Sequence, residues 1–272
     1  MKWCSFEKDH EQKVGVIEGD FVYDVSNQVH TTNLLEVIAR EFIPDIDLDV
    51  APMERLADVR LLAPYRPLKN VMCIGKNYEE HVKEMDTAGA GKLVIFTKSP
   101  TSVVGPETNI ERHPELTDQL DYEGELAIII GKTGRDIETV EDHIFGYTIL
   151  NDVTARDVQK QHGQFFRGKS FDTFCPIGPV IVTPDELNFP LTIETKVNGE
   201  RRQYGTTADM IRPVEELIQT LSKGMTLEAG DIIATGTPAG VGHGMNPPTY
   251  LQTGDTVEVT IHGIGSLRNF VV

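Results

Sequence analysis

The sequence contains few cysteines, only Cys4, Cys73 and Cys175 among 272 residues. Their odd number and wide spacing exclude a disulfide framework, and they do not form the CxxC spacing that is typical of zinc sites. Because free thiols persist in reducing compartments, we expect a cytoplasmic protein. The opening segment, MKWCSFEKDHEQKVGVIEGD, is too polar for the apolar region of a secretory signal, so no signal peptide is predicted.

Positive charge and long apolar runs are also scarce. The chain has 25 Lys and Arg against 42 Asp and Glu, a net charge of −17 with histidine neutral. This mean field repels nucleic acid and anionic membranes, so neither is expected as a partner, although a local cationic pocket is compatible with it. The longest apolar run near the middle of the chain, Leu126 to Ile130, is far too short to span a membrane.

The chain does contain enough apolar material for a sizeable core, since hydrophobic residues make up 39% of it. Short β-branched runs alternate with turn residues and helical patterns are few, which predicts a strand-rich α+β fold. A Pro- and Asp-rich stretch from Pro44 to Pro67 is typical of a connector. We therefore expect a small N-terminal β-rich domain at residues 1–66 and a second domain at residues 67–272.

Two elements are predicted in the N-terminal part. Glu18-Gly19-Asp20 separates two β-branched runs and indicates a hairpin. Thr31 or Thr32 is expected to cap a short helix that continues to Phe42.

Further along the chain, apolar runs and turn signals predict several more elements. Asn198-Gly199 is a strong hairpin signal between residues 191–197 and 200–204. Asp209 is expected to cap a helix with Ile211, Val214, Ile218 and Leu221 on one face. One or two helical turns are expected at residues 139–145, and strands at residues 126–130, 144–150 and 256–261.

Carboxylates are concentrated immediately before the most apolar run of the sequence. Alternation along a strand places Glu123 and Glu125 on the same face, with Asp121 as a further candidate. Asp152 follows a second apolar strand and is the candidate third ligand. Hard oxygen ligands of this kind suit Mg²⁺ or Mn²⁺. The alternative interpretation is a solvated acidic strand edge in an acidic protein.

A histidine and a glutamate form a second candidate site within Gly75 to Met85, GKNYEEHVKEM. In a helix, His81 and Glu84 lie three residues apart on one face, close enough to pair. A carboxylate that orients an imidazole raises its basicity, as activation of water requires. The alternative is an exposed helical pair of little consequence. The sequence contains neither GxSxG nor HExxH, so serine-hydrolase and zinc-protease mechanisms have no support.

Cationic and polar residues supply the remaining candidates. Arg156 and Gln159 follow Asp152, and Lys169 lies in a second basic segment. Near a metal, such side chains bind a carboxylate and stabilise a developing enolate, although surface salt bridges are the ordinary alternative. Thr237 lies in a Gly-rich turn that is able to present backbone N–H groups to an anion, but the turn lacks the spacing of a nucleotide phosphate loop.

In this combination and order the motifs resemble the fumarylacetoacetate hydrolase superfamily. The resemblance covers residues of about 71 to 242 and rests on the segments CIGKNYEEHVKEM, IFTKSPTSVVGP, LDYEGELAIIIG, GYTILNDVTARDVQ, GKSFDTFCPIGP and IATGTPAGVG. It implies a mixed β-sandwich roll, usually a homodimer, with Mg²⁺ or Mn²⁺ held by Glu123, Glu125 and Asp152. It further implies that substrate or enolate is contacted by Arg156, Gln159, Lys169 and Thr237.

The resemblance also implies that His81 and Glu84 form a dyad on a closing lid. The composition of the adjacent residues 86–92 would suit such a lid. Pro238 to Pro248 contains no Asp or Glu, whereas the eponymous hydrolase has the acid partner of its histidine in this segment. The chain therefore looks more like the acylpyruvate hydrolase and oxaloacetate decarboxylase branch.

The leading functional hypothesis is metal-dependent C–C hydrolysis of a 2,4-diketo acid of the acylpyruvate type. His81, oriented by Glu84, would deprotonate water for attack on the distal carbonyl, and the metal and Lys169 would stabilise the pyruvate enolate that leaves. Alternatives that share the enolate are decarboxylation or tautomerisation of oxaloacetate and isomerisation of 2-hydroxyhepta-2,4-diene-1,7-dioate. A non-catalytic, metal-containing binding module is the alternative from another class.

Overall fold

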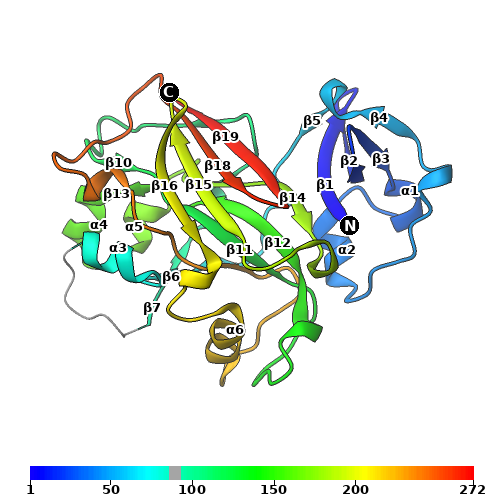
Figure 1. The fold of residues 1–272 in the computed structure, drawn as a ribbon. Coiled ribbons are helices and arrows are strands. Elements are labelled where there is room, and N and C mark those ends of the chain that lie inside the picture. The colour runs from blue at the N-terminus through cyan, green and yellow to red at the C-terminus, as the bar shows by residue number, and fades with distance from the viewer. Residues whose placement is uncertain (86–92) are drawn as a thin grey trace.

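The computed structural model describes residues 1–85 and 93–272. Its N-terminal part, drawn in blue in Figure 1, is a set of short strands with two small helices. They are β1 (Lys2–Lys8), β2 (Glu11–Glu18), β3 (Phe21–Asp24), α1 (Ser26–Val29), α2 (Leu34–Ala39), β4 (Met53–Arg55) and β5 (Arg60–Leu61). Strands β2 and β3 pair antiparallel with Glu18 opposite Phe21, which confirms the predicted hairpin.

Helix α2 differs in its bounds from the sequence-based expectation. Its N-cap is Asn33, whose side chain accepts a hydrogen bond from the backbone N–H of Leu35, so neither threonine caps the helix. The Thr31 hydroxyl instead accepts from the N–H of Asn33 and bonds the Glu36 carboxylate. The helix ends at Ala39 rather than at Phe42, and Glu41 adopts a left-handed backbone conformation that helical residues do not have.

One large mixed sheet runs through most of the molecule. Within residues 1–85 and 93–272 it has 12 strands, with the main order β4-β3-β2-β1-β14-β12-β11-β17-β6-β7 and with β5 and β8 attached to β1 and β14. The additional strands are β6 (Val71–Gly75), β7 (Val94–Lys98), β8 (Val103–Val104), β11 (Gly124–Ile130), β12 (Ile144–Asn151), β14 (Cys175–Val182) and β17 (Ile232–Ala234). Because β1 pairs with β14, the sheet is continuous across residues 66 and 67, and the domain division there stays a prediction.

A second sheet packs on the first and completes the sandwich (Figure 1). Its order is β16-β15-β18-β19-β9, with β9 (Asn109–Ile110), β15 (Thr192–Val197), β16 (Glu200–Thr206), β18 (Thr256–Ile261) and β19 (Gly265–Val271). Asn198 and Gly199 both have positive φ, as a two-residue hairpin turn requires, so the predicted hairpin is confirmed. Ile193 and Val259 share one buried core with Leu126 of the large sheet. The strand-rich sandwich predicted from the sequence is thus confirmed.

Short helices and one small ladder complete the fold. They are α3 (Glu79–Glu84), β10 (Leu120–Asp121), β13 (Thr154–Ala155), α4 (Arg156–His162), α5 (Phe166–Lys169) and α6 (Val214–Ser222). No helix in the described part of the chain is long and apolar enough to cross a membrane. Residues 141–143 form a 3₁₀ turn before β12, so the helical turn expected at residues 139–145 is shorter than predicted.

Helix α6 begins later than the sequence predicted. It starts at Val214, directly after Pro213, whereas Asp209 lies in a separate 3₁₀ turn and Ile211 lies outside the helix. A residue that precedes proline is disfavoured in the helical conformation, so Arg212 interrupts the predicted helix. The apolar face is otherwise as expected, with Ile218 and Leu221 among its buried residues.

Candidate active site

Three carboxylates converge where β11 begins and β12 ends. Gly124 pairs with Asn151, and the backbone N–H of Asp152 donates to the carbonyl of Glu123 at 2.8 Å. As a result, ligand oxygens of Glu123, Glu125 and Asp152 lie within 4.8 Å of one another, and all three residues are buried. The structure therefore brings together the three residues that the sequence pattern singled out. Their role as metal ligands stays a prediction.

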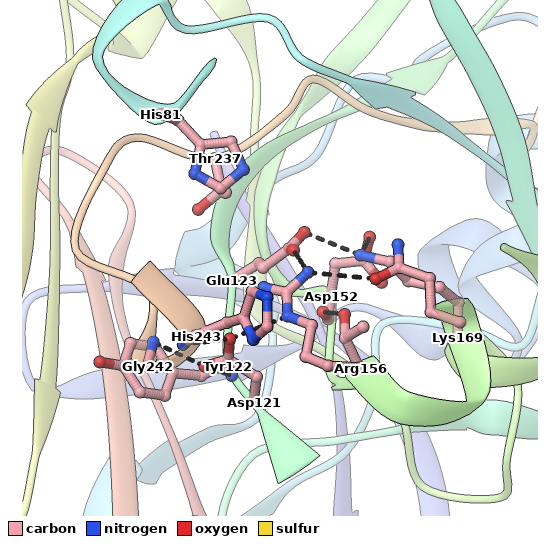
Figure 2. A network of polar contacts seen from close by, with 12 residues as sticks. His81, Asp121, Tyr122, Glu123, Asp152, Arg156, Lys169, Thr237, Gly242 and His243 are labelled. Atoms are coloured by element: carbon pink, nitrogen blue, oxygen red, sulfur yellow. Dashed lines mark hydrogen bonds and ion pairs between the residues drawn. The ribbon is translucent and has the colours of Figure 1, made fainter. Parts of the chain in front are cut away.

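Three cationic side chains surround this acidic triad. Lys169 bridges Glu123 and Asp152 at 2.8 Å each, and the Arg156 Nη1 lies 2.7 Å from the Glu123 Oε1. The third cation is Lys98 of β7, which is fully buried and bonds Asp152 and the backbone carbonyl of Val153. Figure 2 shows this ion network from close by. Sequence reasoning missed Lys98, although a single lysine ending the run Val94-Ile-Phe-Thr was a usable signal.

The electrostatics of the triad push two neighbouring carboxylates in opposite directions. Burial alone would raise the pKa of Glu123, but the charges of Lys169 and Arg156 lower it to about 2. For Glu125, burial and the charges of Asp152 and Glu123 together raise the pKa well above its ordinary range. Its Oε2 accepts a hydrogen bond from the backbone N–H of Gly236 at 2.8 Å. Burial is the largest cause of the raised pKa of Glu125, and the nearby charge of Lys169 does not offset it.

The chemistry of the donor set fits a divalent cation. All three groups are oxygen donors, which Mg²⁺ and Mn²⁺ prefer, and they converge in a buried position. Burial and the charges of Asp152 and Glu123 oppose ionisation of Glu125, and a divalent cation held at the triad would favour it. Glu123, Glu125 and Asp152 are the residues that would hold it.

Asp121 lies beside the triad rather than in it. Its Oδ2 accepts from the Arg156 Nε at 2.9 Å and from the backbone N–H of His243 at 3.0 Å, and its Oδ1 accepts from the N–H of Gly242 at 2.7 Å. The suggestion that Asp121 joins the two glutamates on one face is therefore wrong, because β10 and β11 are separate strands and alternation breaks between them.

The predicted dyad forms on the short helix α3. The Nδ1 of His81 and the Oε2 of Glu84 are 3.3 Å apart, and His81 is 8% exposed. Glu84 also accepts from the backbone N–H of Gly240, at 2.9 and 3.2 Å to its two oxygens. Glu84 therefore contacts the loop of residues 238–248, which itself contains no Asp or Glu. The predicted lid continues into residues 86–92, which lie outside the described residues.

Like Arg156 and Lys169, the predicted substrate contacts Thr237 and Gln159 have partners within the protein. The Thr237 hydroxyl donates to the carbonyl of Gly124 at 2.9 Å and accepts from the Gln203 Nε2 at 2.8 Å. Its single donor is therefore used on the backbone, which leaves one lone pair for a ligand. Gln159 accepts from the Arg156 Nη1 at 3.4 Å. Gln203 was not identified from the sequence, because only the hairpin β15–β16 brings it to this loop.

These side chains surround one cavity of about 790 Å³. The polar residues that line it include His81, Glu123, Glu125, Arg156, Lys169 and Thr237, whereas Glu84 and Asp152 are not part of its lining. In Figure 2 the His81 ring stands apart from the ion network, on the α3 side. The cavity also has apolar lining, made by Ile74, Val82, Met85, Phe96 and Phe165. An imidazole thus shares one cavity with a candidate metal site and two buried cations.

Known proteins share this architecture. Residues 70–272 match the family described as fumarylacetoacetate (FAA) hydrolase C-terminal. The oxaloacetate tautomerase YisK of Bacillus subtilis is 55% identical over 224 residues, which are 80% of this chain and 74% of that protein.

Solved structures agree along the whole chain. A fumarylacetoacetate hydrolase from psychrophilic Exiguobacterium antarcticum is 62% identical, with a TM-score of 0.94 over 100% of this chain and 99% of that one. A 2-hydroxyhepta-2,4-diene-1,7-dioate isomerase from Mycobacterium marinum is 37% identical, with a TM-score of 0.82 over 100% and 98% of the two chains. The chain therefore belongs to the fumarylacetoacetate hydrolase family, an enzyme family that includes hydrolases, isomerases and tautomerases.

Proposed function

We propose that this protein is a Mg²⁺- or Mn²⁺-dependent enzyme that interconverts the enol and keto forms of a small 2-oxo acid, with oxaloacetate as the first candidate. The observation that carries the proposal is that His81, which is paired with Glu84, lines the same cavity as Lys169 and two carboxylates of the acidic triad, those of Glu123 and Glu125. The 55% identity to a protein named oxaloacetate tautomerase supports the choice of substrate.

The geometry assigns each side chain a task in proton transfer. A divalent cation at the triad supplies Lewis-acid polarisation of the 2-oxo group when it is bound. With Nδ1 directed at Glu84, His81 has Nε2 available to the substrate, where it carries the proton between the enol oxygen and the neighbouring carbon. Glu84 orients the ring, and the Lys169 ammonium stabilises negative charge on the oxygen. The reaction gains and loses no proton overall, so one base suffices.

The test is the decay of enol-oxaloacetate, followed by the ultraviolet absorbance of the enol. Mn²⁺ is added in one series and EDTA in another, and each rate is corrected for the same solution without protein, because the uncatalysed reaction is also fast. We expect metal-dependent acceleration that is lost in Glu123→Ala and in His81→Ala. Equal decay rates with and without the wild-type protein would rule out the proposal.

Hydrolysis of an acylpyruvate is the second candidate, and the 62% identity to a fumarylacetoacetate hydrolase favours it. There the same dyad would deprotonate water instead of the substrate. Pyruvate release from acetylpyruvate, again with Mn²⁺ or EDTA, separates hydrolysis from tautomerisation. Pyruvate release from oxaloacetate would instead indicate decarboxylation, and turnover of only a larger oxo-dienoate would indicate isomerisation, as in the Mycobacterium marinum neighbour.

Two further expectations belong to the same proposal. If no metal raises the unfolding temperature, a non-catalytic module replaces the enzyme as the better hypothesis, whereas an oxalate-induced shift that requires metal supports the enzyme.

The homodimer inferred from the family resemblance is tested by light scattering of the full chain. The cytoplasmic location stays a prediction from the cysteine content.

A further inference from the structure

Asp121 is a fully buried carboxylate that the proposed chemistry does not use. Besides the Arg156 Nε, it accepts from three backbone N–H groups, those of Tyr122, Gly242 and His243, at 2.7–3.0 Å. Figure 2 shows it below the ion network, next to Gly242 and Arg156. A buried carboxylate with four donors is held in one orientation, so a side chain that it binds is fixed as well.

Arg156 is the charged partner that Asp121 fixes. Its guanidinium uses Nε on Asp121 and Nη1 on Glu123, while Nη2 is buried and has no hydrogen-bond partner among the described residues. Arg156 is 5% exposed and lines the cavity. A buried N–H without a partner costs about 1–3 kcal/mol, which calls for an explanation. A ligand oxygen in the cavity provides one.

The planar guanidinium makes this arrangement directional. Two carboxylates that bind Nε and Nη1 leave the third nitrogen no freedom, because all three nitrogens lie in one plane. Asp121 therefore sets the direction of Nη2, whereas Glu123 and Gln159, which both accept from Nη1, would leave the group free to pivot about that one nitrogen.

The same carboxylate also ties Arg156 to the loop that holds the dyad. Asp121 binds the backbone of Gly242 and His243, two to three residues after Gly240, whose N–H donates to Glu84. A Cβ on Gly242 would come within 2.8 Å of the Asp121 Oδ1 and 2.1 Å of the Thr249 carbonyl oxygen, so this contact requires glycine. Asp121 thus contacts both Arg156 and the loop that binds Glu84 of the dyad.

We propose that Asp121 is a positioning residue that sets the Arg156 guanidinium so that Nη2 binds the carboxylate of the 2-oxo acid substrate. The substrate class rests on the proposed function, but the positioning itself is tested without turnover. Oxalate is the probe, because it presents two adjacent carboxylates of the size of a 2-oxo acid group.

The experiment is a double-mutant cycle on oxalate binding, measured by calorimetry at saturating Mn²⁺. Asp121→Asn keeps the shape of the side chain but removes its charge and places an NH₂ group against donors. We expect oxalate to bind about ten- to a hundredfold more weakly, the loss expected for a misplaced charge-assisted hydrogen bond. In the Arg156→Gln background, Asp121→Asn should change the affinity by less than about twofold, because the residue acts through Arg156.

Two controls separate positioning from a general structural role. Asp231→Asn removes another buried carboxylate, which binds Lys69 at 3.1 Å and the N–H of Glu228 at 2.8 Å, and it should leave oxalate affinity unchanged. Asp121→Glu keeps the buried charge and provides a folded variant if the asparagine unfolds. It too should weaken oxalate binding, because the longer side chain moves the guanidinium. Affinity for Mn²⁺ alone should stay within about threefold of wild type in both Asp121 variants.

Several results would overturn the proposal. One is unchanged oxalate affinity in both Asp121 variants, or no oxalate binding by the wild type. Another is that the effects of Asp121→Asn and Arg156→Gln on oxalate affinity multiply in the double variant. A third is a loss of Mn²⁺ affinity in the Asp121 variants that equals their loss of oxalate affinity. If the cycle behaves as expected while enol-oxaloacetate decays at the uncatalysed rate, the positioning role stands and the proposed tautomerase activity falls.

Discussion

Charged residues are used differently in the N-terminal unit, residues 1–66, and around the cavity. In the N-terminal unit, Lys8 pairs with Glu54 and Lys13 with Asp24 at the surface, above a core of apolar side chains. Around the cavity, carboxylates and cations are buried together, and Lys169 with Asp152 is an example in which both side chains are almost fully buried. Cavity-lining residues run from Ile74 to His243, so the N-terminal unit supplies none of them.

The two regions differ in the desolvation cost of their charged residues. Burying an ion pair costs several kcal/mol of desolvation per ion, and apolar residues of similar volume often stabilise a fold more. Surface pairs cost little and contribute little. The buried charges around the cavity, next to a core that has ample apolar residues, are therefore better explained by a role in chemistry than by a role in stability. The same kind of substitution should have very different consequences in the two regions.

The largest effect is expected from Glu123→Ala. It removes a candidate metal ligand and one of the two carboxylate partners of each of the buried cations Lys169 and Arg156. We expect activity to fall by about a thousandfold or more, loss of the Mn²⁺-induced thermal shift, and a decrease of about 3 kcal/mol in the free energy of unfolding. Enzyme assays, thermal shift and urea denaturation measure the three.

The matched control is Glu54→Ala, which also removes a glutamate that pairs with a lysine, Lys8, at 3.0 Å. Because this pair is at the surface, the free energy of unfolding should change by less than about 1 kcal/mol, with no effect on activity. Comparable losses in the two variants would remove the contrast between the regions.

His81→Ala should separate catalysis from metal binding. Loss of the general base lowers kcat by about a hundred- to ten-thousandfold, while the Mn²⁺-induced thermal shift persists, because His81 is not in the triad. His262→Ala, at an exposed position, serves as the histidine control and should behave as wild type. A His81 variant that loses Mn²⁺ binding would place the imidazole in the metal site instead.

Glu84→Gln is expected to have a smaller effect. His81 remains, but the neutral amide orients and polarises the ring less well, so kcat should fall by about ten- to a hundredfold with little change in KM. Glu80→Gln, which breaks an exposed pair with Lys83 on the same helix, is the control and should leave kcat unchanged. If the two variants behave alike, the dyad has no catalytic role.

Much of this site follows from local sequence rules. Alternation along a strand is a local property, so the proximity of Glu123 and Glu125 was readable before any tertiary structure was known, although Glu123 directly precedes β11 rather than lying in it. Helical spacing likewise paired His81 with Glu84. The turn residues Asn198-Gly199 fixed a hairpin because few residues other than Asn, Asp and Gly adopt its backbone conformation at low cost.

The remaining features depend on contacts between distant segments. Lys98 meets Asp152 across 54 residues, and no local pattern relates them. Asp121 was grouped with the glutamates because alternation was assumed to continue, whereas β10 pairs with β13 in a ladder of its own. Pro213 was a usable signal for the late start of α6, but the apolar periodicity that begins before it favoured an earlier start. Pairing partners and strand breaks therefore have to come from the structure.

The smallest effect is expected from Asp24→Asn in the N-terminal unit. Burial alone would raise the pKa of Asp24, but Lys13, 2.8 Å away, and Ser26 lower it below the ordinary value. A lowered folded-state pKa stabilises the protein above the unfolded-state value of about 3.9, and this contribution is lost as the pH falls through the folded-state pKa. Because the pair is partly exposed, the variant should lose only about 0.5 kcal/mol at neutral pH and nothing at pH values below both pKa values. Urea denaturation across this pH range checks the sign, and an equal loss at all pH values would mean that Asp24 acts through packing rather than through its charge.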